Sequence, residues 1–201
     1  KAHHVDLFPM LERAALLAPP SMVLGITGGE PTLHKKALFR FLDAVLSART
    51  DLHFHILTNA QHFEPEDRPF LTSIRDRVTW GIPLYSAQAD LHDEIVKKPG
   101  AFGWLAKSLA LLARCGADIE LRTVVMKPNA PALPDLADFL TRQVPFVSTW
   151  AIMQLENIGY GRMNWGSLFF DSSADFVPVG QAIDIARARG LRPLLYNFPL
   201  C

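Results

Sequence analysis

Short apolar runs alternate with amphipathic stretches from one end of the chain to the other. The apolar runs predict strands at six places: 22–27, 52–58, 78–84, 118–126, 148–156 and 192–197. Helical spacing between them predicts helices at 5–18, 34–48, 65–75, 101–115, 132–142 and 176–189. Strands that alternate with helices are typical of a parallel sheet with helices packed outside it. We therefore expect an α/β fold with a mostly parallel sheet and outer helices.

The helical pattern is clearest between residues 101 and 115. Four apolar residues follow one another there at spacings of three and four: Phe102, Leu105, Leu109 and Leu112. Gly116 comes directly after them and suits a helix cap. The glycines of 157–166 predict an irregular turn, and no segment has the composition of a linker between domains.

Side-chain alternation divides each predicted strand into two faces. In 118–126, Glu120 and Arg122 share one face, and we expect Arg122 to point toward the centre of a barrel. The pair either neutralise each other there or bind a ligand. One face of 148–156 carries four residues, the last two near the carboxyl end, where barrels place their chemistry: Trp150, Ile152, Gln154 and Glu156.

Composition narrows the class of protein. Of the 201 residues, 49% are hydrophobic and 20% are charged, which is typical of a globular chain, and no apolar run is long enough to cross a membrane. Lys and Arg total 20, as do Asp and Glu, so no net field attracts nucleic acid or acidic lipid. Two cysteines and no secretory signal favour a cytoplasmic protein.

The strongest local motif is Gly-Gly-Glu-Pro at residues 28–31, between a predicted buried strand and a predicted helix. Two glycines let the backbone approach a ligand, and proline stiffens the turn, so the motif suits a small zwitterion. An ordinary strand-to-helix turn, with Glu30 beside a helix dipole, is the simpler alternative. The Gly-Lys-Ser/Thr ending of a phosphate-binding loop is missing.

Gly-Gly-Glu-Pro after such a strand resembles the signature with which radical S-adenosylmethionine (SAM) enzymes hold the amino group of SAM. Leu57-Thr58-Asn59-Ala60 is similar to the family's Leu-Thr-Asn-Gly, with alanine in place of glycine, and His92-Asp93 with 99–102 resembles a segment of its peptide-modifying members. The resemblance implies a partial (β/α)6 barrel, with Arg122 facing the SAM carboxylate. The cofactor-binding residues that we expect are Gly28, Gly29, Glu30, Pro31, Asn59, Tyr85, Ser86, Arg122, Gln154 and Glu156.

A narrower resemblance, to the radical SAM maturase of the His-Xaa-Ser system, rests on several segments: 81–86 through His92-Asp93, then Glu156, Gly159 and Asn164, and finally 196–201. It implies an enzyme that cleaves SAM reductively with an external electron donor. The resulting 5'-deoxyadenosyl radical would then modify a peptide or protein with His-Xaa-Ser repeats. Most peptide-modifying relatives have Ser-Ile-Asp-Gly where this chain has residues 83–86.

The family's cluster loop, Cys-x-x-x-Cys-x-x-Cys, is missing from residues 1–201. We therefore expect a core barrel truncated at both ends, with the [4Fe-4S] ligands before residue 1 and a cysteine region after residue 201. Cys201 is a candidate ligand of an auxiliary cluster, whereas Cys115 suits packing. The histidines lack a third ligand at zinc spacing. A degenerate barrel that binds peptide or nucleotide without chemistry, and an ordinary barrel enzyme, remain the alternatives.

Overall fold

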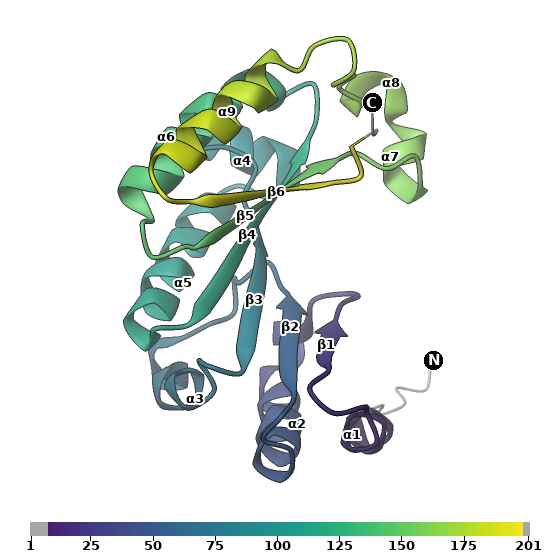
Figure 1. Ribbon diagram of the computed structural model, residues 1–201, viewed down its shortest axis with the longest axis vertical. Coiled ribbons are helices and arrows are strands. Elements are labelled where there is room, and N and C mark those ends of the chain that lie inside the picture. Colours follow the sequence, from purple (N-terminus) through teal and green to yellow (C-terminus); the bar gives the residue numbers. More distant parts are fainter. Residues whose placement is uncertain (1–7, 199–201) are drawn as a thin grey trace. The chain divides into compact units, whose positions relative to one another are not determined.

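The computed structural model describes residues 8–198, and its six strands form one parallel sheet in which their order follows the chain (Figure 1). The strands are β1 (Val23–Ile26), β2 (His53–Leu57), β3 (Val78–Pro83), β4 (Asp118–Val125), β5 (Thr149–Gln154) and β6 (Arg192–Tyr196). All six lie within the predicted ranges. The expected α/β fold with a parallel sheet and outer helices is confirmed.

The longer helices also lie close to their predicted positions: α1 (Phe8–Leu16), α2 (Lys35–Ala48), α3 (Arg68–Ser73), α5 (Ala101–Cys115), α6 (Leu133–Gln143) and α9 (Val177–Ala188). Gly116 caps α5 as expected. It has a φ of +65°, and the two following amides, Gly116 N–H and Ala117 N–H, bond to the carbonyls of Ala113 and Leu112 at 3.0 Å. Every helix between residues 8 and 198 is too short or too polar to cross a bilayer.

Three short helices were not predicted: α4 (Ala89–Val96), α7 (Gly159–Met163) and α8 (Trp165–Leu168). In α4 the buried position belongs to His92, a polar residue, so apolar periodicity does not mark the helix. The segment 157–166 was predicted as an irregular turn, which is wrong for α7. That helix has two glycines and no buried residue, so its sequence lacks a helical pattern.

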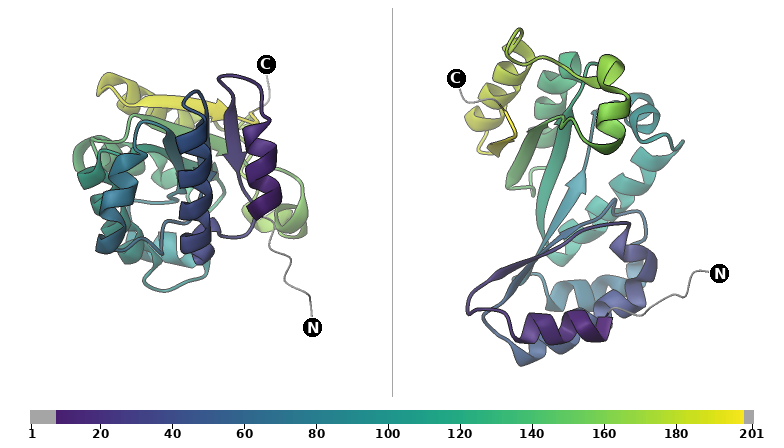
Figure 2. Two further views of the ribbon diagram at one scale, coloured as in Figure 1. Left: turned by 90° about the horizontal axis from the view of Figure 1, so that it is seen from below. Right: turned by 90° about the vertical axis from the view of Figure 1, so that its right-hand side faces the viewer.

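The chain divides into two compact units, and the first comprises Lys1–Gly81 with Lys107–Asp118. Its strands pair in parallel, with Gly25 opposite His55 and His55 opposite Thr79. Phe54 lies on the alternate face, where its ring meets that of Phe41 from α2 edge to face at 5.6 Å. The helices α1 and α2 lie side by side over this face (Figure 2). The face with Gly25 and His55 therefore points away from the helices.

The second unit comprises Ile82–Ala106 with Ile119–Cys201, and its helices α6 and α9 lie side by side (Figure 1). The parallel register of β4 and β5 places Leu121 beside Trp150 and Val125 beside Gln154. These four side chains are buried. Arg122 is on the other face of the strand. Gln154 therefore does not share the face of Arg122, which corrects the expectation that both line the centre.

The last strand, β6, carries a proline in its interior. Arg192 donates its N–H to the carbonyl of Ser148 at 3.1 Å. Backbone groups alternate sides along a strand, so Pro193 turns its nitrogen away from β5. Proline has no N–H to donate, and a position that does not bond to β5 is one that it tolerates.

Candidate functional site

The Gly-Gly-Glu-Pro motif forms a tight turn directly after β1. Gly28 and Gly29 have φ values of +97° and +56°, a region that favours glycine. A Cβ at either position would meet nothing within 4 Å, so open space lies beside this backbone. Pro31 begins a short 3-10 helix, Pro31–His34, for which Glu30 is the N-cap. The turn thus leaves open space at the two positions where other residues would carry a side chain.

The carboxylate of Glu30 joins this turn to the end of β2. Its Oε1 accepts hydrogen bonds from the backbone N–H of Thr32 at 3.0 Å, from the Thr32 hydroxyl at 2.5 Å and from the Thr58 hydroxyl at 2.5 Å. Its Oε2 accepts the backbone N–H of Asn59 at 2.7 Å. Because Thr32 and Thr58 are buried, these bonds lie at least partly out of water. Glu30 therefore has a structural role beyond the expected interaction with a helix dipole.

The segment after β2 forms a second turn, and Asn59 helps to build it. The Asn59 side-chain oxygen accepts the N–H of Gln61 at 3.0 Å, and the Thr58 hydroxyl accepts the N–H of Ala60 at the same distance. Ala60 is buried and has a φ of +57°, a conformation that glycine adopts more easily. The glycine of the resembling family motif thus corresponds to a backbone position that favours glycine.

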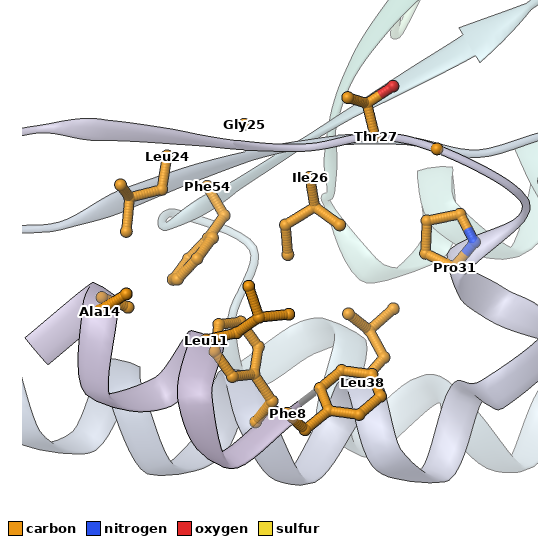
Figure 3. Close-up of a pocket in the computed structure, with 13 residues that line it drawn as sticks. Phe8, Leu11, Ala14, Leu24, Gly25, Ile26, Thr27, Pro31, Leu38 and Phe54 are labelled. Atoms are coloured by element: carbon orange, nitrogen blue, oxygen red, sulfur yellow. The ribbon is translucent and has the colours of Figure 1, made fainter. Parts of the chain in front are cut away.

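An apolar pocket of about 340 Å³ lies between α1 and β1, on the helix side of the strand. Figure 3 shows Phe8 and Leu11 of α1 opposite Leu24 and Ile26 of β1. A zwitterion needs polar partners, which these side chains lack. The pocket is therefore a poor fit for the methionine end of SAM.

In the second unit, Glu120 and Arg122 form an ion pair on β4. The Arg122 Nη1 lies 2.5 Å from Oε1 of Glu120, and both side chains are largely buried. The guanidinium also lies over the ring of Tyr196, 5.8 Å from its centroid, and contacts the sulfur of Met153 at 3.4 Å. Glu120 and Arg122 thus neutralise each other's charge, which was one of the two alternatives that the sequence left open. The cation–π contact with Tyr196 also helps to hold the Arg122 side chain in place.

Tyr85 and Ser86 follow β3, and their neighbours hold the backbone of this segment. The N–H of Tyr85 donates to Nδ1 of His92 at 3.3 Å, and its carbonyl accepts a bond from the side-chain amide of Asn129 at 3.1 Å. The buried hydroxyl of Ser86 accepts the N–H of Gln88 at 2.9 Å. Burial raises the pKa of the Tyr85 phenol. The segment is therefore fixed from both sides.

The segment that resembles peptide-modifying enzymes has a definite structural role. The carboxylate of Asp93 accepts the N–H of Gly100 at 2.5 Å and the N–H of Phe102 at 2.8 Å, so it caps the start of α5. His92 is 2% exposed, and its ring lies between those of Tyr85 and Phe102, with 5.8 Å between centroids on each side. These residues join α4 to α5 and to the end of β3.

Gln154 and Glu156, at the end of β5, lie in different surroundings. The Gln154 amide nitrogen donates to the carbonyl of Phe170 at 2.7 Å, and its oxygen accepts the hydroxyl of Ser172 at 2.8 Å. Gln154 thus holds the loop that follows α8 against the end of β5 through two hydrogen bonds. Glu156 is exposed and accepts a bond from the Asn197 side chain at 2.9 Å. Its other oxygen makes no hydrogen bond within the part of the chain that the structure describes.

Between residues 8 and 198, no group of three or more His, Cys, Asp and Glu side chains could hold a metal ion. Cys115 is buried, with its Sγ 3.9 Å from the carbonyl of Arg68. Cys201, the candidate ligand of an auxiliary cluster, lies outside the described residues. The 28–31 turn has room for the amino group of SAM, because open space lies on the Cβ side of Gly28 and Gly29 and Glu30 Oε2 keeps a second lone pair.

The structure thus brings together Gly28, Gly29, Glu30, Pro31 and Asn59 in the first unit. Sequence reasoning missed the two threonines that hold Glu30, and it missed Asn129. The signal for Thr58 was present in the Leu-Thr-Asn-Ala motif, but nothing in the sequence pairs it with a glutamate 28 residues away. In the second unit, the predicted residues fall at the ends of β3 and β5 and within β4.

Comparisons with known proteins show which proteins this chain is similar to in sequence and in fold. No protein-family model matches the chain. Over 112 residues, or 56% of its length, it is 28% identical to the antilisterial bacteriocin subtilosin biosynthesis protein AlbA of Bacillus subtilis (strain 168), of which the match covers 24%.

Two solved structures are similar in fold. SuiB of Streptococcus suis, bound to precursor peptide SuiA, matches 98% of this chain with a TM-score of 0.72 and 15% identity. Native anSMEcpe, with bound AdoMet and Kp18Cys peptide, matches 94% with a TM-score of 0.71 and 13% identity. The chain covers 43% and 54% of these proteins, so it spans about half of their length or less. The chain therefore shares the fold of these two proteins, an α/β fold with a six-stranded parallel sheet and outer helices, which is the fold that the radical SAM resemblance implies.

Proposed function

We propose that this chain is the core of a radical SAM enzyme that modifies a peptide or protein. The observation that carries the proposal is the 28–31 turn, in which two glycines with positive φ adjoin open space and Glu30 is locked to Asn59. With one electron from an external donor, SAM and a [4Fe-4S] cluster would supply the radical chemistry that removes a hydrogen atom from the substrate. The protein's own contribution is to bind, orient and shield the reactants.

The residues of the turn would hold the methionine end of SAM. The carbonyls of Gly28 and Gly29 and the second lone pair of Glu30 Oε2 are acceptors that suit an ammonium group. The bonds from Thr32 and Thr58 keep the Glu30 carboxylate in one orientation, so little side-chain entropy remains to be lost when the ligand binds. We assign the SAM carboxylate to Arg122 by resemblance alone.

Calorimetry of the intact, reconstituted protein tests this part. Glu30→Ala and Arg122→Ala should each weaken SAM binding by about 1 to 3 kcal/mol, the scale of a lost charge-assisted hydrogen bond. Glu94→Ala and Arg187→Ala remove exposed charges of the same kind from α4 and α9 and should leave the affinity unchanged. Equal affinity in all four variants would place SAM elsewhere.

The substrate that we propose is a protein partner with His-Xaa-Ser repeats. The sequence resemblance supports it, and so do the similar proteins, since SuiB was solved with a precursor peptide and AlbA takes part in bacteriocin biosynthesis. Exposed Glu156 and partly exposed Tyr85 stand at strand ends where an extended chain could bind. An external donor would provide the electron.

Mass spectrometry of the partner, after incubation with the intact enzyme, SAM and a reductant, tests the function. We expect a mass change confined to the repeats, together with 5'-deoxyadenosine. A matched partner with alanine at the His and Ser positions should stay unmodified. If deoxyadenosine forms while the repeats stay unchanged, the radical chemistry stands and the partner is wrong. If the cluster-loaded protein cleaves no SAM, the proposed activity is wrong and the alternative, a barrel that binds peptide or nucleotide without chemistry, is favoured.

A further inference from the structure

We infer that His92 is a positioning residue that sets the backbone of Tyr85 at the end of β3, and that it does so only while its ring is neutral. The inference concerns Tyr85, at one of the strand ends where we propose that the substrate binds, and its effect on activity rests on that proposed function. Its structural part does not. The geometry that carries it is a two-sided clamp on one peptide segment.

The clamp lies at the point where the backbone after β3 no longer hydrogen-bonds to a neighbouring strand. Within the second unit, the N–H of Leu84 still bonds to the carbonyl of Arg122, at 2.9 Å. The next residue, Tyr85, turns its N–H to Nδ1 of His92 and its carbonyl to the side chain of Asn129. Two side chains from separate segments thus replace the strand that would otherwise bond to Tyr85.

Asn129 is itself held in place, so the clamp has a rigid side. Its amide nitrogen also donates to the carbonyl of Val124 at 3.0 Å, and its oxygen accepts the N–H of Met126 at 2.8 Å. Asn129 is fully buried. The side of the clamp that can change is therefore the one formed by His92.

The bond from Tyr85 requires a lone pair on Nδ1 of His92, so the proton of the neutral ring sits on Nε2. Protonation would turn Nδ1 into a donor that faces another donor, the Tyr85 N–H. The groups packed around the ring are the Tyr85 phenol, the nonpolar Phe102 and the Asp93 carboxylate on the same helix. Burial lowers the pKa of His92 and the charge of Asp93 partly opposes this, so the ring is neutral at pH 7.

The consequence is a site whose shape depends on pH. Above the pKa of His92, the Tyr85–Ser86 segment is fixed by both partners. As the pH falls through that pKa, the His92 bond is lost and the Tyr85 segment loosens on one side. A substrate that binds at Tyr85 would then meet a less ordered surface.

The structural test is an NMR titration of the isotopically labelled intact protein. We expect the His92 ring to titrate with a pKa below 6.5, and the amide resonance of Tyr85 to shift with the same midpoint. In His92→Asn, whose side-chain oxygen can still accept the bond, the Tyr85 amide should no longer respond to pH. A Tyr85 amide that ignores the titration of His92 in the wild type would overturn the inference, whatever the enzyme does.

The functional test uses the pH profile of partner modification. The wild type should lose activity on the acid side, and His92→Asn should keep its activity while losing that dependence. His92→Leu, which fills the space without an acceptor, should lower kcat/KM by about fivefold to tenfold above the pKa of His92, the scale of one hydrogen bond, and should approach the wild type below that pKa. His34→Asn, at an exposed histidine of the first unit, should keep the wild-type profile.

An unchanged loss of activity at acid pH in His92→Asn would contradict the role of the ring. An inactive wild type whose Tyr85 amide follows His92 would refute the proposed function and leave the clamp intact.

Discussion

Glu30 and Asn59 are 29 residues apart in the sequence, and a 2.7 Å hydrogen bond from the Asn59 amide to the Glu30 carboxylate joins them. The bond connects the ends of β1 and β2, the two strands whose motifs resemble the radical SAM family. The turn that we propose to bind SAM and the junction between the two strand ends thus share one side chain. Loss of Glu30 should therefore affect the stability of the protein as well as the affinity for SAM.

We expect Glu30→Ala to lower the free energy of unfolding by about 2 to 3 kcal/mol, because buried or part-buried donors on Thr32, Thr58 and Asn59 lose a charged acceptor. Urea denaturation measures the change. Glu94→Ala, at an exposed site of α4, should change stability by no more than about 0.5 kcal/mol. Equal stabilities for the two variants would show that the junction contributes nothing.

Asp93→Ala should destabilise the protein by about 1 to 2 kcal/mol, because the first amides of α5 lose their cap. Asp93→Asn keeps an acceptor and should recover much of the loss. The matched control is Asp184→Ala, which removes an exposed carboxylate from α9. A loss as large for Asp184 as for Asp93 would point to charge rather than capping as the cause.

Ala60→Gly should stabilise the protein by up to about 1 kcal/mol, because the φ of +57° strains an alanine and not a glycine. The same substitution at Ala110, exposed in the middle of α5, should instead destabilise by about 1 kcal/mol. Thermal or chemical unfolding of both variants checks the contrast in sign. Destabilisation of similar size at both positions would contradict the conformational argument.

The stability of the protein should fall as the pH drops below about 6.5, the usual pKa of histidine. Burial lowers the pKa of both His53 and His92, so between the folded and unfolded pKa values the unfolded chain binds more protons. The stabilisation is complete above the unfolded pKa and is lost as the pH falls toward the folded one. Unfolding curves from pH 5 to 8 should show this slope, and the double variant His53→Gln with His92→Asn should reduce it.

The six strands could be predicted because their apolar runs are local features of the sequence, and so could the Gly116 cap. The face of Gln154 could not, since alternation says which residues share a face and not which face the helices cover; the register with β4 decides that. The bonds of Glu30 depend on strand ends 28 residues or more apart in the chain. α4 was missed because its one buried side chain, His92, is polar and serves the Tyr85 backbone.

Pro193 bears on how the protein behaves at high concentration. The outer side of a terminal strand is a template on which other chains can grow by backbone pairing, the first step of many aggregates. On β6, Pro193 turns its nitrogen outward, so a chain approaching from that side would meet a missing donor at the second of the strand's five residues. Pro193 thus makes this edge a poorer template for the backbone pairing of another chain.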